Sequence, residues 1–164
     1  MRIGITYDLR EDYGIERDSQ VFADFCHPDE IAYMADGIRA NGYEPVLLGN
    51  MYHLNERILN RSLGCDLVLI CDEGIQSRNR EAIVPALLEL NRIPYIGSDA
   101  YCMGLSQNKY HTKLVAEALG IDCPKGIYLP ADQPVPAQLP PFPLIVKPNE
   151  EGYSMGVFLV HYRK

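Results

Sequence analysis

The stretch that decides the fold is DLVLIC at residues 66–71, which runs into the polar loop CDEGIQSRNREA at residues 71–82. Its continuous apolar run is typical of a strand that is buried on both faces of a parallel sheet. Open parallel sheets bind ligands beyond the carboxyl ends of their strands, so this loop stands where a site is expected. An ordinary solvated loop with a charged helix start remains the alternative interpretation.

Short apolar runs alternate with helical patterns on both sides of this strand. Strands are predicted at residues 2–7 (RIGITY), 44–48 (EPVLL) and 93–96, and helices at residues 28–40, 55–60, 80–91 and 108–119. Pro28 suits a first helical position, and Pro85 predicts a kink or a late start in the third helix. The alternation predicts an α/β fold, a Rossmann-like parallel sheet with crossover helices on both faces.

The last forty residues have a different character. PADQPVPAQLPP at residues 130–141 reads as a semi-rigid connector, and strands at 142–147 and 157–160 enclose the loop NEEGYSMG at 149–156. We therefore expect a main domain at residues 1–125 and a hairpin-like piece at 126–164. Such a piece cannot bury a core of its own, so it must pack on the first domain, a second copy or a further segment.

Composition excludes several classes of function. The formal net charge of −7 and the pI near 5.0 argue against a nucleic-acid groove or an anionic membrane surface. Five cysteines without a C-x-x-C pair favour a reducing compartment. No signal peptide and no run of about eighteen apolar residues occurs, so we expect a cytoplasmic protein without membrane partners.

Lysine is absent until Lys109, and all five lysines lie in the last third of the chain. Lys109 and Lys113 share one helix face, where they repel each other unless an anion or a carboxylate is near. Ser106 or Asn108 can cap this helix and leave backbone donors for an anion. The alternative is a solvated face, with Tyr110, Leu114 and Ala118 turned inward.

Lys147 ends an apolar strand, and Gly152 and Gly156 bracket a loop that can bring backbone N–H groups onto phosphate oxygens. A plain turn between two strands is the alternative. The four histidines lack metal-ligand spacing, so no metal site is predicted, and no nucleophile elbow occurs. Residues 8–24 are expected to form a mobile, solvated acidic loop.

Taken in order, three segments resemble the ATP-grasp superfamily, in its D-alanine:D-alanine ligase-like branch. They are EGIQSRNREAIVPALLELNRIPYIGSDA (73–100), NKYHTKLVAEALGIDCPK (108–125) and PFPLIVKPNEEGYSMGV (141–157). The resemblance implies a pre-ATP-grasp domain, followed by the first β-hairpin of an ATP-grasp domain. Members of the family are about twice this length, so the chain is expected to be a truncated, N-terminal portion.

The resemblance also implies roles for individual residues. Lys109 and Lys147 match lysines that bind ATP, and Glu151, Gly152, Ser154 and Gly156 match the loop that folds over its phosphates. Glu73, Arg78, Glu81 and Tyr153 match positions that border the amino-acid substrate. No catalytic residue is assigned, and magnesium ligands are expected in the missing C-terminal part.

Three departures from the family pattern stand out. Asn108 replaces a usual aspartate, and Tyr153 replaces a usual serine, which points away from D-alanine as the substrate. The glutamate that the family places after the first strand has no clear counterpart among Glu11, Glu16 and Glu30.

The leading hypothesis is the N-terminal portion of an ATP- and magnesium-dependent carboxylate–amine ligase that forms an acyl phosphate and is inactive as an isolated chain. Its partners would be ATP and an amino acid or a small peptide. One alternative is a short non-catalytic binding or assembly module, a homodimer through the hairpin. The other is an ATP-grasp ligase for another amino acid or peptide.

Overall fold

The computed structural model describes residues 1–16 and 22–162. Unit by unit along the chain, the elements are β1 (Arg2–Tyr7), the 3₁₀ turn η1 (Arg10–Tyr13), α1 (Pro28–Ala40), β2 (Glu44–Gly49), α2 (Met51–Leu59), β3 (Leu67–Cys71), the 3₁₀ turn η2 (Arg80–Ala82), α3 (Ile83–Leu90), β4 (Tyr95–Ile96), α4 (Ala100–Gln107), α5 (Lys109–Ala118), β5 (Leu144–Val146) and β6 (Phe158–Val160). Within the described part of the chain, no helix is long and apolar enough to span a bilayer.

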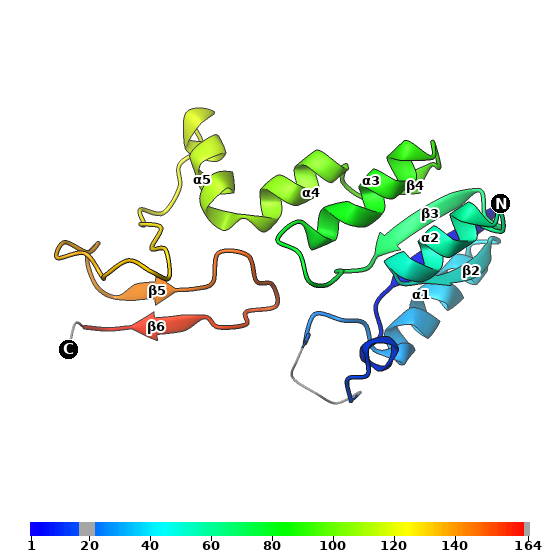
Figure 1. The fold of residues 1–164 in the computed structure, drawn as a ribbon, viewed down its shortest axis with the longest axis horizontal. Coiled ribbons are helices and arrows are strands. Elements are labelled where there is room, and N and C mark those ends of the chain that lie inside the picture. The colour runs from blue at the N-terminus through cyan, green and yellow to red at the C-terminus, as the bar shows by residue number, and fades with distance from the viewer. Residues whose placement is uncertain (17–21, 163–164) are drawn as a thin grey trace. The chain divides into compact units, whose positions relative to one another are not determined.

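A four-stranded parallel sheet in the order β2-β1-β3-β4 forms the centre of the first part (Figure 1). One buried cluster joins strands β2 and β3 to helices α2 and α3 through residues such as Leu48, Leu54, Val68 and Leu88. Helix α1 buries Ile31 and Ala35 outside that cluster. Figure 1 shows α1 and α3 on opposite sides of the sheet, which confirms the predicted α/β fold with helices on both faces.

Local sequence explains where the helices begin. The His27 side chain accepts a hydrogen bond from Asp29 N–H, and Glu30 accepts one from His27 N–H, so α1 opens with a capping box before Pro28. Asn50 caps α2, which therefore starts at Met51, earlier than the predicted 55. Helix α3 has the predicted late start, because Pro85 lies in its first turn, where no intrahelical N–H bond is required.

Two expectations about the first part were wrong. Only Val68 of β3 is fully buried, and the other residues of this strand are half-buried, so β3 is not covered completely on both faces. Helix α4 was missed, because Gly104 and polar residues leave it without a clear apolar stripe. The signal that could have found it is Asp99, whose carboxylate accepts a hydrogen bond of 2.7 Å from Cys102 N–H at the start of α4.

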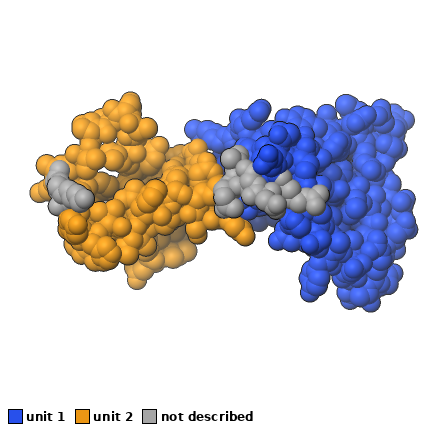
Figure 2. Space-filling view, turned by 90° about the horizontal axis from the view of Figure 1, so that it is seen from below, with its two compact units in different colours: residues 1–104 blue, residues 105–164 orange. Residues whose placement is uncertain are grey.

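The chain divides into two compact units, residues 1–104 and 105–164 (Figure 2). Strands β5 and β6 of the second unit form an antiparallel pair in which Ile145 faces Leu159, as the hairpin prediction required. Helix α5 belongs to this second unit, whereas the sequence interpretation placed it in a domain ending at residue 125. That domain boundary stays a prediction.

Candidate functional site

The carboxyl ends of β1 and β3 bring two aspartates side by side in the first unit. Tyr7 pairs with Cys71 in the parallel register, so Asp8 and Asp72 follow at the same edge of the sheet. The Thr6 hydroxyl donates a 2.5 Å hydrogen bond to Asp72 Oδ1. Both carboxylates are buried, and each is therefore expected to need hydrogen-bond partners.

Asp8 fixes the loop that follows β3. Its Oδ2 accepts hydrogen bonds from the N–H groups of Glu73 and Gly74, at 2.8 and 2.7 Å. Its Oδ1 accepts a hydrogen bond of 2.5 Å from the hydroxyl of Tyr13 in η1. One buried carboxylate thus joins the start of the chain to the loop at residues 73–82.

Gly74 is required at its position by the backbone. Its φ of +70° lies in the left-handed region, and a Cβ there would lie 2.8 Å from the carbonyl oxygen of Arg80. The loop therefore closes tightly between β3 and η2. This closure holds Glu73 near the start of η2.

Burial changes the acidity of this edge of the sheet. Desolvation raises the pKa of Asp72 to about 6, and the nearby charge of Asp8 adds to the effect. Desolvation also raises the pKa of Glu73 to about 7, helped by the charges of Glu81 and Asp24 and opposed by Arg80. Near neutral pH, Glu73 is therefore a carboxyl group that can hold or release a proton.

Asp24 is a member of this edge that the sequence interpretation did not select. Its side chain is 6% exposed, and its Oδ2 lies 3.8 Å from the guanidinium of Arg80. Its Oδ1 is buried and has no hydrogen-bond partner among residues 1–16 and 22–162. The expectation of a mobile, solvated loop at residues 8–24 was wrong at both ends, because Asp8 is buried and the side chain of Asp24 is only 6% exposed. Residues 17–21 lie outside the described part.

The predicted substrate residues of the first unit are only partly brought together. Glu73 and Glu81 lie close enough for their charges to interact, with Glu81 in η2. Arg78 is exposed, and the guanidinium that acts on Glu73 is the buried Arg80.

In the second unit, Lys109 joins helix α5 to the loop before β6. Its ammonium donates hydrogen bonds to the backbone carbonyls of Asn149, at 3.4 Å, and Glu151. The structure therefore brings two predicted nucleotide-site residues, Lys109 and Glu151, into contact. Lys113 Nζ lies 3.7 Å from Glu117 Oε1. This carboxylate is the kind of partner that the sequence predicts near the two lysines of this helix face.

The first turn of α5 has its own polar partners. The N–H of Lys109 donates to the Asn149 carbonyl at 3.1 Å, and the N–H of Tyr110 donates to Asn149 Oδ1 at 2.9 Å. Asn108 Oδ1 accepts from His111 N–H at 2.9 Å. The expectation of backbone donors left for an anion is thus wrong at these amides, because two asparagines use them.

The inward face of α5 also differs from the alternative interpretation. Leu114 and Ala118 are exposed, whereas Tyr110, Lys113 and Ala116 are partly covered. Tyr110 stacks on Tyr128 with ring centroids 5.0 Å apart. The lysine-bearing side of the helix therefore faces the rest of the second unit.

The remaining predicted residues lie between β5 and β6. Lys147 is exposed directly after β5. Tyr153, Ser154 and Gly156 all have positive φ, and a Cβ on Gly156 would lie 2.7 Å from Pro148. Gly152 accepts a hydrogen bond from Met155 N–H, so residues 152–156 form a tight turn that presents Tyr153 and Ser154 to solvent.

Comparison with known proteins identifies relatives of this chain by sequence. No family model matches the chain. It is 34% identical over 128 residues to D-alanine–D-alanine ligase of Aromatoleum aromaticum and 32% identical over 121 residues to that of Halorhodospira halophila. These matches cover 76% and 74% of the chain but 38% and 36% of the relatives. The chain is related to the N-terminal part of the D-alanine–D-alanine ligases.

Solved structures of such ligases support this relationship. The D-alanine–D-alanine ligase of Bacillus anthracis matches with a TM-score of 0.67 and 25% identity, over 99% of this chain and 50% of that one. The fold is therefore that of the ATP-grasp ligases of this branch, through the first hairpin. The chain spans about two fifths of the curated relatives and half of this solved chain.

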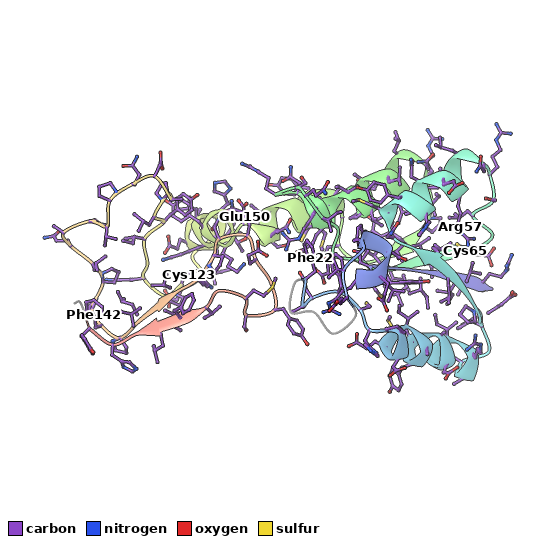
Figure 3. The ribbon with its side chains drawn as sticks, turned by 60° about the horizontal axis from the view of Figure 1, so that its bottom comes forward. Phe22, Arg57, Cys65, Cys123, Phe142 and Glu150 are labelled. Carbon is purple, nitrogen blue, oxygen red and sulfur yellow. The ribbon has the colours of Figure 1, made fainter. Side chains whose placement is uncertain are left out.

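The contacts give a physical reason for one departure from the ligase pattern. While Asn108 Oδ1 caps α5, its Nδ2 donates a 3.1 Å hydrogen bond to Glu150 Oε1. Figure 3 labels Glu150 in the loop beside α5. An aspartate could cap the helix but could not donate to Glu150, so asparagine suits this position in this chain.

We expect Asn149→Ala to destabilise the second unit by about 1 kcal/mol, because Tyr110 N–H loses its side-chain cap. Amide hydrogen exchange in the first turn of α5 measures the change. Gln133→Ala is the control, since Gln133 is exposed in the connector. Equal exchange rates at Tyr110 and His111 in both variants would contradict the prediction.

Proposed function

We propose that this chain forms the N-terminal part of an ATP-dependent carboxylate–amine ligase of the D-alanine–D-alanine ligase type, which proceeds through an acyl phosphate. The contact of Lys109 with the loop at residues 149–156 carries the proposal. It joins two segments that resemble the nucleotide site of such ligases, in a chain related to them by sequence and fold. The cytoplasm is the proposed location, in keeping with five free thiols.

The proposed site residues of the second unit have the chemistry needed to bind a nucleoside triphosphate. Lys109 and Lys147 supply cations, and Glu151, Gly152, Ser154 and Gly156 supply the loop that would cover the phosphates. ATP would supply the phosphoryl group that activates a carboxylate. Lys109 would hold the loop to α5, and Lys147, exposed at the end of β5, would offset phosphate charge.

Magnesium is a different matter. Among residues 1–16 and 22–162, no group of three or more histidine, cysteine, aspartate or glutamate side chains could hold a metal ion. The described residues therefore supply no such group for magnesium, and no step is assigned to that ion.

The first unit fits the amino-acid side of the reaction. Glu73, Arg78, Glu81 and, in the second unit, Tyr153 are the proposed substrate residues. Carboxylates attract an ammonium group, and Glu73 can accept a proton near neutral pH because burial raises its pKa to about 7. Asp24 and Arg80 are added to these proposed substrate residues, because their side chains are nearly covered and their charges act on Glu73.

The isolated 164 residues are expected not to release phosphate from ATP at an enzymatic rate when D-alanine and magnesium are supplied. The chain matches 38% of a relative, and the described residues offer no group of three or more histidine, cysteine, aspartate or glutamate side chains that could hold magnesium. A coupled phosphate assay measures this, with a full-length D-alanine–D-alanine ligase as the positive control. Turnover that is lost in Lys147→Met would show that the chain is active alone.

One alternative function has a specific observation in its favour. The β5–β6 pair exposes Ile145, Val146, Phe158 and Leu159 to solvent, each by more than half. Exposed apolar strands favour association, so a non-catalytic module that dimerises through this hairpin is the second candidate. The mass in solution and the reading frame after Lys164 separate the two. A stable dimer and an immediate natural stop codon favour the module.

The third candidate is a ligase of the same type for another amino acid or peptide. Tyr153 is 75% exposed on the loop, at the position where the family usually has serine. A tyrosine side chain would change the shape of a substrate site. Screening of amino-acid pairs with the complete protein tests it, and a preference for D-alanine would exclude it.

A further inference from the structure

Three sulfur-bearing side chains meet at the carboxyl end of β3 in the first unit, outside the residues assigned to the ligase reaction. They belong to Cys26, Met34 and Cys71, which we call the sulfur cluster. Cys71 Sγ lies 3.6 Å from Met34 Sδ. Cys26 Sγ donates a weak hydrogen bond of 3.7 Å to the backbone carbonyl of Cys71. All three residues are partly covered and both thiols are free.

The fold brings these atoms together from three places in the chain. Cys71 is the last residue of β3, and Met34 follows Ile31 on the side of α1 that is turned to the protein. Cys26 precedes the capping residue His27 at the start of α1. Because β3 and α1 are regular elements, the positions of Met34 and Cys71 are fixed by packing and not by a loop.

We propose that the sulfur cluster binds a soft monovalent metal ion, Cu(I). Two thiolates and a thioether are the donors that Cu(I) prefers, whereas magnesium and calcium prefer oxygen. On binding, each thiol loses its proton to solvent and gives a Cu–S bond, and Met34 donates a lone pair without losing a proton. No electron is transferred.

The surroundings favour a cation. The carboxylates of Glu30, Asp8 and Glu73 act on Cys26, and those of Asp72 and Glu73 act on Cys71. Burial, helped by these charges, raises the pKa of Cys26 to about 12 and that of Cys71 to about 11. Binding of a cation must therefore displace two tightly held protons, and its attraction to the surrounding carboxylates offsets part of that cost.

The test is an anaerobic titration of the 164-residue protein with Cu(I), in competition with a chromophoric Cu(I) chelator. We expect one Cu(I) per chain and the release of two protons, so that affinity rises roughly a hundredfold for each pH unit below the thiol pKa values. Cys71→Ser is expected to lower the affinity by roughly two orders of magnitude, since a thiolate ligand is lost.

Met34→Leu tests the cluster without touching a thiol. Leucine has a similar volume, so the fold is kept while the thioether is removed, and affinity should fall roughly tenfold. Cys65→Ser and Cys123→Ser are the matched controls, because these cysteines (labelled in Figure 3) belong to neither α1 nor the end of β3. Both controls should bind like the unchanged protein.

Three results would overturn the proposal. One is a Cu(I) affinity that is the same in the unchanged protein, in the Met34→Leu variant and in the Cys71→Ser variant. Another is loss of binding in a control cysteine variant. The third is rapid formation of a Cys26–Cys71 disulfide with hydrogen peroxide in a protein that binds no Cu(I).

Discussion

Asp8→Ala is expected to lower the unfolding free energy of the first unit by about 3–5 kcal/mol, the largest effect of any single change considered. The side chain is 1% exposed and accepts three hydrogen bonds. Alanine would leave the Tyr13 hydroxyl and the N–H groups of Glu73 and Gly74 without their acceptor. Each buried donor that loses its partner costs roughly 1–3 kcal/mol.

Asp8→Asn is the matched control. Its amide oxygen can still accept from the two backbone N–H groups, and its Nδ2 can donate to the Tyr13 oxygen. We therefore expect a loss of about 1 kcal/mol, near the net worth of one hydrogen bond. Urea unfolding followed by far-ultraviolet circular dichroism measures both variants. Equal midpoints for the alanine and asparagine variants would show that the three hydrogen bonds do not stabilise the unit.

The same variants bear on function. Asp8 holds the backbone of Glu73, a proposed substrate residue, so Asp8→Ala should also free the loop at residues 73–82. Amide exchange at Glu73 and Gly74 is expected to rise more than exchange in β2, because the hydrogen bonds described for Asp8 go to Tyr13, Glu73 and Gly74. The stability of the sheet edge and the position of Glu73 thus depend on one carboxylate.

Periodicity was enough to predict the architecture. Strands at residues 2–7 and 44–48 and the helix from Pro28 were predicted within one or two residues, because apolar spacing and caps are local signals. Helix α4 lacks such spacing and was missed. The burial of Asp8 and Asp24 could not be predicted, since acidic residues near a chain start usually are solvated and their partners lie far along the sequence.

The candidate site was predictable to a smaller extent. The assignment of Lys109 and Glu151 to one site followed from resemblance, not from spacing, because about forty residues separate them; their direct contact was not predicted. Arg80 and Asp24 were not selected, since nothing local distinguishes a buried arginine from the exposed Arg78. Asn149 was not selected either, because its role as a second cap for α5 depends on tertiary structure.

The second large effect is expected from pH, through Asp72. Its carboxyl has a pKa of about 6 in the folded protein, against 3.8 for the unperturbed group. Below about pH 4 the group is protonated in both states and its contribution to stability is complete. Between pH 4 and 6 the unfolded chain loses the proton while the folded protein keeps it, so stability falls as pH rises and then levels off.

The size of this loss is roughly 3 kcal/mol, by the relation between pKa and free energy. Glu73, whose pKa is raised to about 7, acts in the same direction and extends the fall toward neutral pH. The first unit is therefore expected to be more stable at pH 4.5 than at pH 8. Acid unfolding of other carboxylates would act in the opposite direction, so a variant has to isolate the contribution of Asp72.

Asp72→Asn isolates it, because asparagine cannot titrate and its oxygen can still accept the hydrogen bond from Thr6. At pH 8 the variant should be more stable than the unchanged protein by about 2–3 kcal/mol, whereas near pH 4 the two should converge. Asp132→Asn, at an exposed position of the connector, is the control substitution. Urea midpoints measured from pH 4 to 8 give the curves. Parallel curves for Asp72→Asn and the unchanged protein would mean that Asp72 is ionised in the folded state throughout, and that Thr6 and not desolvation determines its acidity.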